Sequence, residues 1–452
     1  MIDEGLLSPG TSGHDESVSD AVVCDALVTV EVALTRAWGE VGAAPIAVVS
    51  SVSDALGWAG SGELAQGHGV SVADLAAAGR AGGNPVIPLV KTLRVVVGDR
   101  AAAGGAAAEW VHRGATSQDI LDSALMLVAA RAVAEIRTHL TALEGSLRTL
   151  AAAEQNTLTV ARTLTQQAVP TTLGARVAVW QQGVARALVR LAAVQLPAQL
   201  AGAGGTLAAF VERSDAATAA RLVEAFAAEL QLDAPAAPWH TSRWPITELG
   251  DALVQALDAL GKIATDVATA ARTEIGELAE GAGGGSSAMP QKQNPVAAVL
   301  IRSSALRAPQ LGATLHLSAA LAADERPDGA WHAEWQTLRE LLRLGLGASA
   351  LGAELIAGLR VDHEAVARNA ASSRGLILAE RLSISLAPAI GKDAVARIVT
   401  AASAGEDLHT LVTDAVRDAG ADLDVDALLD PQGYLGLAKE LATAPTTPGE
   451  PG

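Results

Sequence analysis

The fold class follows from the stretch Ile120–Ala153, which reads ILDSALMLVAARAVAEIRTHLTALEGSLRTLAAA and contains no proline and a single glycine. Its apolar residues recur at the spacing of a helix that buries one face. Four further long runs accompany it: Thr172–Leu196, Ile246–Glu280, Val296–Ala322 and Trp331–Leu359. Helices of this length exceed the average of about 11–12 residues in globular proteins. The sequence therefore predicts an all-α fold built on a bundle of long helices, and no strand pattern of comparable strength competes with it.

Glycine and proline breaks divide the chain into three predicted helical domains. Residues 1–108 are broken repeatedly and predict a small N-terminal helical domain. Residues 109–360 carry the long runs and predict the central bundle, whereas the shorter pieces in 361–442 predict a C-terminal helical domain. Residues 443–452, TAPTTPGEPG, are expected to form a disordered tail.

Composition excludes several classes of partner. Half of the 452 residues are hydrophobic but only 2% are aromatic, so the core must be built from alanine, leucine and valine. The net charge of −18 argues against nucleic acid, which needs a basic face. No apolar run is long enough to predict a membrane span. An anionic substrate remains possible, because surface charge is screened within about 8–10 Å and a local cluster of cations decides binding inside a pocket.

Cysteine usage and the N-terminus bear on the cell compartment. The single cysteine, Cys24, rules out an internal disulfide and argues against a cysteine-based metal site. The first residues, MIDEG, lack the charged and then apolar pattern of a secretion signal. We therefore expect a cytoplasmic protein, with no metal and no organic cofactor.

A glycine-rich segment, Gly283–Pro295, reads GGGSSAMPQKQNP and is the strongest functional signal in the chain. Three glycines allow backbone conformations closed to other residues, while Pro290 and Pro295 stiffen the far side. Such a loop is suited to bring a serine hydroxyl close to the cation of Lys292, as a lid that carries its own catalytic group. The alternative is a glycine-rich linker with incidental serines.

A second cluster, Trp110–Asp119 (WVHRGATSQD), lies directly before the long run at Ile120. Threonine, serine and aspartate are residue types that cap helices, and the start of a capped helix presents N–H groups to an anion. Thr116 and Ser117 are therefore candidates to bind a carboxylate. The alternative is that they only cap the helix and that His112 is a structural histidine.

A third cluster, Ala161–Pro170 (ARTLTQQAVP), offers an arginine that can bind a carboxylate in a bidentate manner. Its alternative is a polar loop that joins two helices. A further segment, Glu325–Trp335 (ERPDGAWHAEW), contains Arg326, which is either a surface base or a carboxylate clamp. Trp331 and Trp335, four positions apart, are expected to pack in the core.

Together these segments resemble the signature of the fumarase/aspartase superfamily, whose members add to, or eliminate from, carboxylate-bearing substrates. The resemblance implies a small polycarboxylate substrate and a homotetramer in which each active site takes segments from three subunits. It implies that Ser286 is the acid/base on the mobile loop and that Lys292 and His112 are further catalytic groups. The substrate-binding residues that it implies are Thr116, Ser117, Arg162, Thr163, Gln166, Ser287, Met289, Asn294 and Arg326.

Leu164 separates the branches of this superfamily. Adenylosuccinate and argininosuccinate lyases carry at this position a histidine that protonates the leaving nitrogen, and leucine cannot do this. An amine needs such a proton to depart, whereas a carboxylate, whose conjugate acid has a pKa of about 4, does not. Val299 similarly stands where adenylosuccinate lyases carry a glutamate. Both differences from the family pattern argue against a C–N lyase.

Two other segments, Gly83–Val90 and Glu325–Trp335, resemble the carboxymuconate cycloisomerase branch of the superfamily. We therefore expect an intramolecular lyase that closes a lactone ring during the degradation of protocatechuate. A C–N lyase that releases fumarate from a succinyl adduct, including one of secondary metabolism, is the alternative. A non-catalytic helical structural protein, such as a lens crystallin of this superfamily, is a third hypothesis, and the presence of Ser286, Lys292 and Asn294 argues against it.

Overall fold

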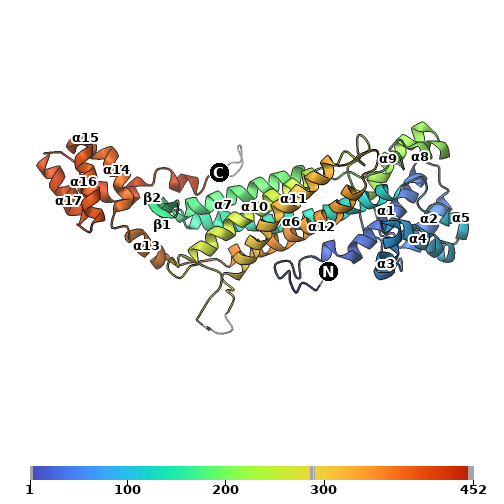
Figure 1. Cartoon of the computed structure of the whole chain (residues 1–452), viewed down its shortest axis with the longest axis horizontal. Helices are drawn as coiled ribbons and strands as arrows, with labels where there is room; N and C mark the ends of the chain where they lie inside the picture. The colour runs from blue at the N-terminus through green and yellow to red at the C-terminus, as the bar shows by residue number, and fades with distance from the viewer. Residues whose placement is uncertain (1–3, 286–288, 290, 446–452) are drawn as a thin grey trace. The chain divides into compact units, whose positions relative to one another are not determined.

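The computed structural model describes residues 4–285, 289 and 291–445, and Figure 1 shows its helices and strands in chain order by colour. The chain forms two compact units. The first unit comprises Met1–His139, Leu188–Asp258 and Ser303–Ala350, and the second comprises Leu140–Ala187, Ala259–Arg302 and Leu351–Gly452. Both are dominated by helices, so the predicted all-α fold is confirmed. The predicted division into three domains stays a prediction, and residues 446–452 of the predicted tail lie outside the described residues.

Long helices form where the sequence predicts them. Each of them contributes residues to both units: α6 (Ser117–Ala153), α7 (Leu173–Ala193), α10 (Trp244–Ala270), α11 (Val296–Ala320) and α12 (Gly329–Ala357). One predicted boundary is wrong, because α10 ends at Ala270 and not at Glu280. The chain there turns through Gly276, whose φ of 65° lies in the left-handed region, and enters the short strand β3 (Leu278–Ala279). The absence of proline from Ile246–Glu280 was therefore not enough to show where the helix ends.

Small residues let the long helices approach one another closely. In the first unit, a Cβ atom added to Gly250 of α10 would lie 2.6 Å from a methyl group of Leu315 in α11. In the second unit, a Cβ atom on Gly352 of α12 would lie 2.9 Å from Leu260 of α10. Contacts below 3.0 Å force a shift, so these glycines set the separation between helices whose buried residues are mainly alanine, leucine and valine.

The remainder of the first unit is a set of shorter helices. The longest of them, α1 (Asp20–Glu40), begins at an N-cap serine, Ser19, whose side chain accepts a hydrogen bond from the N–H of Val22. The others are η1 (Glu16–Val18), α2 (Ile46–Leu56), α3 (Val72–Gly82), α4 (Val86–Arg100), α5 (Gly104–Ala108), α8 (Ala208–Arg213) and α9 (Ala216–Leu230). Helix α1 is buried along most of its length, which makes it the centre of this part of the unit.

The second unit adds two small antiparallel pairs of strands that the sequence did not predict. Strands β1 (Leu158–Thr163) and β2 (Gln166–Thr172) form a hairpin, and β3 pairs with β4 (Arg360–Val361). The C-terminal helices have their own apolar core around Leu386 and Val412. These elements are α13 (His363–Ala371), η2 (Leu376–Leu378), α14 (Ala379–Ser385), α15 (Ala387–Ile390), α16 (Lys392–Ser403), α17 (Leu408–Asp418), α18 (Val425–Leu429), η3 (Pro431–Tyr434) and α19 (Ala438–Leu441).

The length and hydropathy of a helix decide whether it can span a membrane. Within residues 4–285, 289 and 291–445, none of the helices combines the length and the apolar character that a bilayer span requires.

Candidate active site

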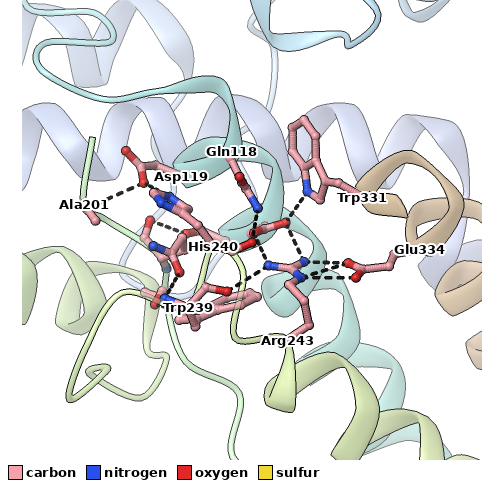
Figure 2. A network of polar contacts seen from close by, with 12 residues as sticks. Gln118, Asp119, Ala201, Trp239, His240, Arg243, Trp331 and Glu334 are labelled. Atoms are coloured by element: carbon pink, nitrogen blue, oxygen red, sulfur yellow. Dashed lines mark hydrogen bonds and ion pairs between the residues drawn. The ribbon is translucent and has the colours of Figure 1, made fainter. Parts of the chain in front are cut away.

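The start of α6 is held by the carboxylate of Asp119, which is fully buried (Figure 2). Its Oδ2 accepts the backbone N–H of Thr116 at 3.0 Å, which is one of the two hydrogen bonds of a capping box with Thr116 in its first and Asp119 in its fourth position. The same carboxylate accepts the N–H groups of Ala201 and Gly202, and Nε2 of His240 lies 2.8 Å from its Oδ1. Asp119 thereby fixes the helix start and leaves the side chain of Thr116 available for other contacts.

Two predicted substrate-binding residues meet at this helix start. Nη1 of Arg326 donates a hydrogen bond to Oγ1 of Thr116 at 3.0 Å, and the guanidinium carbon lies 5.1 Å from the ring centroid of Trp331. Trp331 is buried, as its helical spacing predicts, whereas Trp335 is only half-buried. Ser117, the first residue of α6, is half-buried beside this contact. The arrangement places a cation next to the positive end of a helix, which favours a carboxylate ligand.

Below the helix start, a buried ion network connects α6, α12 and the residue directly before α10 (Figure 2). Arg243 pairs with Asp122 and Glu334, with Nη–O distances of 2.7 Å to each, and all three side chains are almost fully buried. Nε1 of Trp331 donates to Asp122 at 2.9 Å. Burial opposes the charge on Arg243, but the two carboxylates outweigh it and raise the pKa of its guanidinium. The sequence analysis missed this network, although charges inside apolar helical runs are its signal.

His112 lies in the loop before α6 and has a φ of 62°, a conformation that non-glycine residues adopt rarely. Its Nδ1 lies 2.8 Å from Oε1 of Glu31 in α1. Burial of the ring is the largest single effect on its pKa and would lower it. The Glu31 carboxylate, with a smaller contribution from Asp119, outweighs burial and raises the pKa of His112. Glu31 is thus a partner of a predicted catalytic residue that the sequence analysis missed.

The third predicted cluster forms the β1–β2 hairpin. Thr163 pairs with Gln166 across the turn, and the two turn residues, Leu164 and Thr165, have φ values of 47° and 72°. A two-residue turn with both φ values positive matches the twist of the strands but usually contains glycine or asparagine. The Leu164 side chain is 95% exposed in this chain. A turn made of such unusual residues is not recognisable from the sequence, which is equally compatible with a polar loop.

Arg162, a predicted substrate-binding residue, contacts an internal carboxylate. Its Nη1 and Nη2 lie 3.2 and 2.5 Å from the two oxygens of Glu277, whose side chain is 1% exposed. Arg176 and Asn369 donate to the same carboxylate. Burial is the largest effect on Glu277 and opposes its charge, but these donors together outweigh it and lower the pKa of its carboxyl group. A role of Arg162 in substrate binding stays a prediction.

The glycine-rich loop is closed at its base. The N–H groups and carbonyls of Gly284 and Asn294 exchange hydrogen bonds of 3.0 and 2.9 Å, and a Cβ atom on Gly284 would lie 2.2 Å from Val296. Beyond the loop, both oxygens of Glu280 accept the N–H groups of Ala297 and Ala298 at the start of α11. Glu280 precedes the loop and caps α11, the helix that follows the loop. It therefore connects the segment before the loop to the segment after it.

The predicted loop residues differ in what the structure describes of them. Lys292 is exposed, and its N–H donates to the carbonyl of Met289, which is also exposed. Ser286 and Ser287 lie outside the described residues. The candidate residues therefore fall into two sets, one in each unit: the first set is His112, Thr116, Ser117 and Arg326, and the second is Arg162, Thr163, Gln166, Met289, Lys292 and Asn294. Their roles as a single site stay a prediction.

Comparison with known proteins decides the family. A family model described as a lyase matches residues 14–309. The chain belongs to the fumarase/aspartase superfamily. It is 43% identical to a nitrosuccinate lyase from Streptomyces davaonensis, over 98% of this chain and 94% of the relative. It is also 38% identical to a 3-carboxy-cis,cis-muconate cycloisomerase from Pseudomonas aeruginosa, over 93% of this chain and 91% of the relative.

Solved structures agree with this membership. The crystal structure of the 3-carboxy-cis,cis-muconate lactonizing enzyme from Pseudomonas putida matches with a TM-score of 0.82 and 33% identity, over 93% of this chain and 92% of that chain. That of the β-carboxy-cis,cis-muconate cycloisomerase from Acinetobacter calcoaceticus matches with a TM-score of 0.83 and 31% identity, over 94% and 95% of the two chains. This fumarase/aspartase member is therefore an enzyme of the lyase and cycloisomerase class, and the superfamily acts on small carboxylate substrates.

Proposed function

We propose that this enzyme interconverts 3-carboxy-cis,cis-muconate and its lactone. In the lactone-forming direction, a carboxylate oxygen of the substrate attacks a carbon of the diene and forms the C–O bond. The electron pair of the broken double bond then takes up a proton at the carbon next to another carboxylate. The substrate anion thus gains one proton, and the two compounds are isomers when they are counted as neutral acids. The reaction therefore requires a proton donor to carbon and a site for several carboxylates.

The observation that carries this proposal is Leu164. The hairpin tip, where related C–N lyases carry a general-acid histidine, ends in an aliphatic side chain and a threonine. A site without an acid at this position is suited to a weakly basic oxyanion that departs or attacks without a proton, and is poorly suited to an amine. An intramolecular carboxylate is such an oxyanion. The similarity to several cycloisomerases over more than nine-tenths of the chain supports the same reaction.

In this proposal the substrate carboxylates are bound by the cations and N–H groups of the two residue sets. Thr116, Ser117 and Arg326 bind one carboxylate at the start of α6. Lys292 and Asn294 bind another near the loop. Ser286 transfers the proton at carbon, and because an ordinary alcohol is far too weak a base, its alkoxide must be stabilised by nearby N–H groups and by Lys292. We further propose a homotetramer in which different subunits contribute these sets.

A second candidate function is favoured by the 43% identity to a nitrosuccinate lyase. Removal of a proton from C3 of 2-nitrosuccinate, with departure of the nitro group as nitrite, leaves fumarate. Nitrite is also a weakly basic oxyanion, so the absence of a histidine at Leu164 is compatible with this reaction as well. The two candidates share their carbon-acid chemistry and differ in the leaving group.

Purified enzyme should be assayed separately with 3-carboxy-cis,cis-muconate, 2-nitrosuccinate, adenylosuccinate and argininosuccinate. Loss of the ultraviolet absorbance of the conjugated diene reports lactone formation, whereas new fumarate absorbance together with nitrite reports the second candidate. We expect turnover of carboxymuconate, and a Ser286→Ala variant should lose at least about a hundredfold in kcat. Turnover of adenylosuccinate or argininosuccinate alone would overturn the argument from Leu164.

A further inference from the structure

One face of helix α1 contacts the loop that precedes α6 and forms hydrogen bonds with its backbone. Glu31, Thr35 and Trp38 are spaced so that they lie along one side of the helix, and all three are buried. Oγ1 of Thr35 donates to the carbonyl of Trp110 at 3.2 Å, and Nε1 of Trp38 donates to the carbonyl of Arg113 at 3.1 Å. The loop backbone on both sides of His112 is therefore fixed by the helix that also carries Glu31.

The contact between Glu31 and His112 differs from the hydrogen bonds of Thr35 and Trp38, because it joins two ionisable side chains. Oε1 of Glu31 lies 2.8 Å from Nδ1 of His112, and the side chain of Glu31 has no exposed surface. A carboxylate accepts hydrogen bonds, so Nδ1 carries a proton and Nε2 is the ring atom left for a ligand. Within the described part of the chain, no donor reaches Oε2 of Glu31. A buried carboxylate with this single hydrogen bond has a strong electrostatic preference for a charged imidazole.

His112 lines a pocket of about 350 Å³ whose other charged residues are mostly cations. Three arginines, Arg94, Arg113 and Arg213, line it together with one carboxylate, that of Glu109. Among the residues that the structure describes, no carboxylate lies within ion-pair distance of any of these three guanidinium groups. Two of them make contacts with neutral groups: Arg94 donates to the carbonyl of Val111 at 3.2 Å, and Arg113 stacks on Trp110 at 4.3 Å.

The cleft at Arg162 provides a contrast within the same chain. It has a volume of about 440 Å³ and also contains three cations, but each of them has an internal carboxylate partner. Arg162 and Arg176 pair with Glu277, and Lys262 pairs with Asp266. The cations of that cleft are already neutralised, whereas those around His112 are not. An external anion is therefore favoured in the pocket at His112.

We propose that Glu31 is a positioning residue that holds His112 as an imidazolium, and that His112 with Arg94, Arg113 and Arg213 forms a subsite for a carboxylate group of the substrate. The pocket then binds an end of the substrate away from the reacting carbon. This inference rests on the proposed function in one respect, namely that the natural ligand is a polycarboxylate. A substrate with three carboxylates uses such an additional subsite, whereas a dicarboxylate that is bound by Thr116, Arg326 and the loop does not require it.

The groups around His112 act on its pKa in opposite directions, and the carboxylates prevail. Glu31 from α1 and Asp119 from α6 favour the protonated ring, while burial and the charge of Arg94 from α4 oppose it, and the net result is a raised pKa. Arg113 from the same loop and Arg213 from α8 add positive charge to the pocket, and Glu109 subtracts from it. A bound carboxylate would offset the repulsion among these cations and would stabilise the imidazolium further.

Two measurements test the inference, and neither needs turnover. The first is an NMR titration of the full-length enzyme labelled with ¹³C at histidine Cε1, with the signal of His112 identified by its absence in His112→Asn. Asparagine tolerates a positive φ and can still donate to Glu31. We expect His112 to titrate above about 6.5, the ordinary value for histidine. Glu31→Gln should lower the midpoint by about one pH unit or more, which corresponds to the loss of one nearby charge.

A matched control lies on the same helix. Asp25 forms a second carboxylate–histidine pair with His68, at 2.8 Å, outside the pocket. Asp25→Asn should leave the His112 titration unchanged. If wild-type His112 titrates below the ordinary value, or if Glu31→Gln shifts it no more than Asp25→Asn does, the inference is wrong. The wild-type titration decides this even if Glu31→Gln does not fold.

The second measurement is calorimetric binding of propane-1,2,3-tricarboxylate, an unreactive probe, at pH 6 and pH 8. We expect the affinity of the wild type for the probe to fall with increasing pH. In Glu31→Gln this fall should occur at a lower pH, because His112 loses its proton at a lower pH. Arg213→Gln, a change at an exposed residue, should weaken binding about fivefold to tenfold, as expected for one charged contact. Equal affinities for wild type, Glu31→Gln and Arg213→Gln would overturn the subsite. If the probe binds as expected but carboxymuconate is not converted, the proposed function fails and the subsite stands.

Discussion

Arg326 and Thr116 are in direct contact, with Nη1 of the guanidinium 3.0 Å from the hydroxyl oxygen, although they lie on segments far apart in the sequence. The contact joins an exposed cation to a buried helix start whose backbone is already fixed by Asp119. It therefore orients the arginine without neutralising it, since a hydroxyl carries no charge. An arginine oriented in this way is ready to bind a carboxylate.

Replacement of this arginine should affect substrate binding more than the chemical step. We expect Arg326→Gln to raise KM by about tenfold to a hundredfold, the effect of one lost charge-assisted hydrogen bond, with a smaller change in kcat. Steady-state kinetics with carboxymuconate measure this. Arg307→Gln is the matched control, because Arg307 is half exposed and forms an ion pair with Glu340 away from the start of α6. Equal KM values for the two variants would contradict the assignment of Arg326.

The buried Arg243 network predicts a large effect on stability. Arg243→Met removes the cation that Asp122 and Glu334 share and leaves two buried carboxylates without it. Breaking such a pair from one side costs about 3–5 kcal/mol in the free energy of unfolding. Urea denaturation of the variant measures the loss. Arg131→Met, which breaks a pair 3.6 Å apart and largely exposed, should cost less than about 1 kcal/mol, and equal losses would contradict this reasoning.

The sequence predicted the helices well because their signal is local. Apolar spacing and the absence of proline are properties of neighbouring residues, so the start of α6 beside Thr116 and the long runs were recognisable. The β1–β2 hairpin was missed because its turn, Leu164-Thr165, lacks the glycine or asparagine that usually announces one. The end of α10 was missed because the chain leaves the helix to pair Leu278 with Val361, a contact between distant segments.

Partners of the candidate site residues were harder to predict, because each depends on a contact made by folding. Glu31 stands in an apolar run of α1, and a lone charge there signals a buried partner without naming it. Its partner, His112, lies 81 positions away. In the same way, Arg162 was predicted to bind a carboxylate, and the sequence did not show that Glu277 supplies one from within the chain.

Glu277 predicts a specific dependence of stability on pH. Its pKa is lowered in the folded state, so the stability that it contributes is fully present above its unfolded pKa and is lost as pH falls through the folded value. Glu277→Gln should therefore be less stable than wild type at pH 7, and the two curves should converge below about pH 4.3. Urea titrations from pH 7 to pH 3 test this. Glu63→Gln, at a carboxylate that is 64% exposed, should follow the wild-type curve, and a constant difference between Glu277→Gln and wild type would contradict the prediction.

The base of the glycine-rich loop predicts a loss of activity without a loss of fold. A methyl group on Gly284 would lie 2.2 Å from Val296, which forces the Gly284–Asn294 bridge to open, so Gly284→Ala should lower kcat by more than about tenfold through misplacement of the loop. Gly285→Ala is the neighbouring control, since no atom of the described residues lies within 4 Å of its added methyl group, and it should lose much less. Thermal unfolding of both variants should stay close to that of wild type. If Gly284→Ala retains full kcat, closure of the loop base does not position the catalytic group.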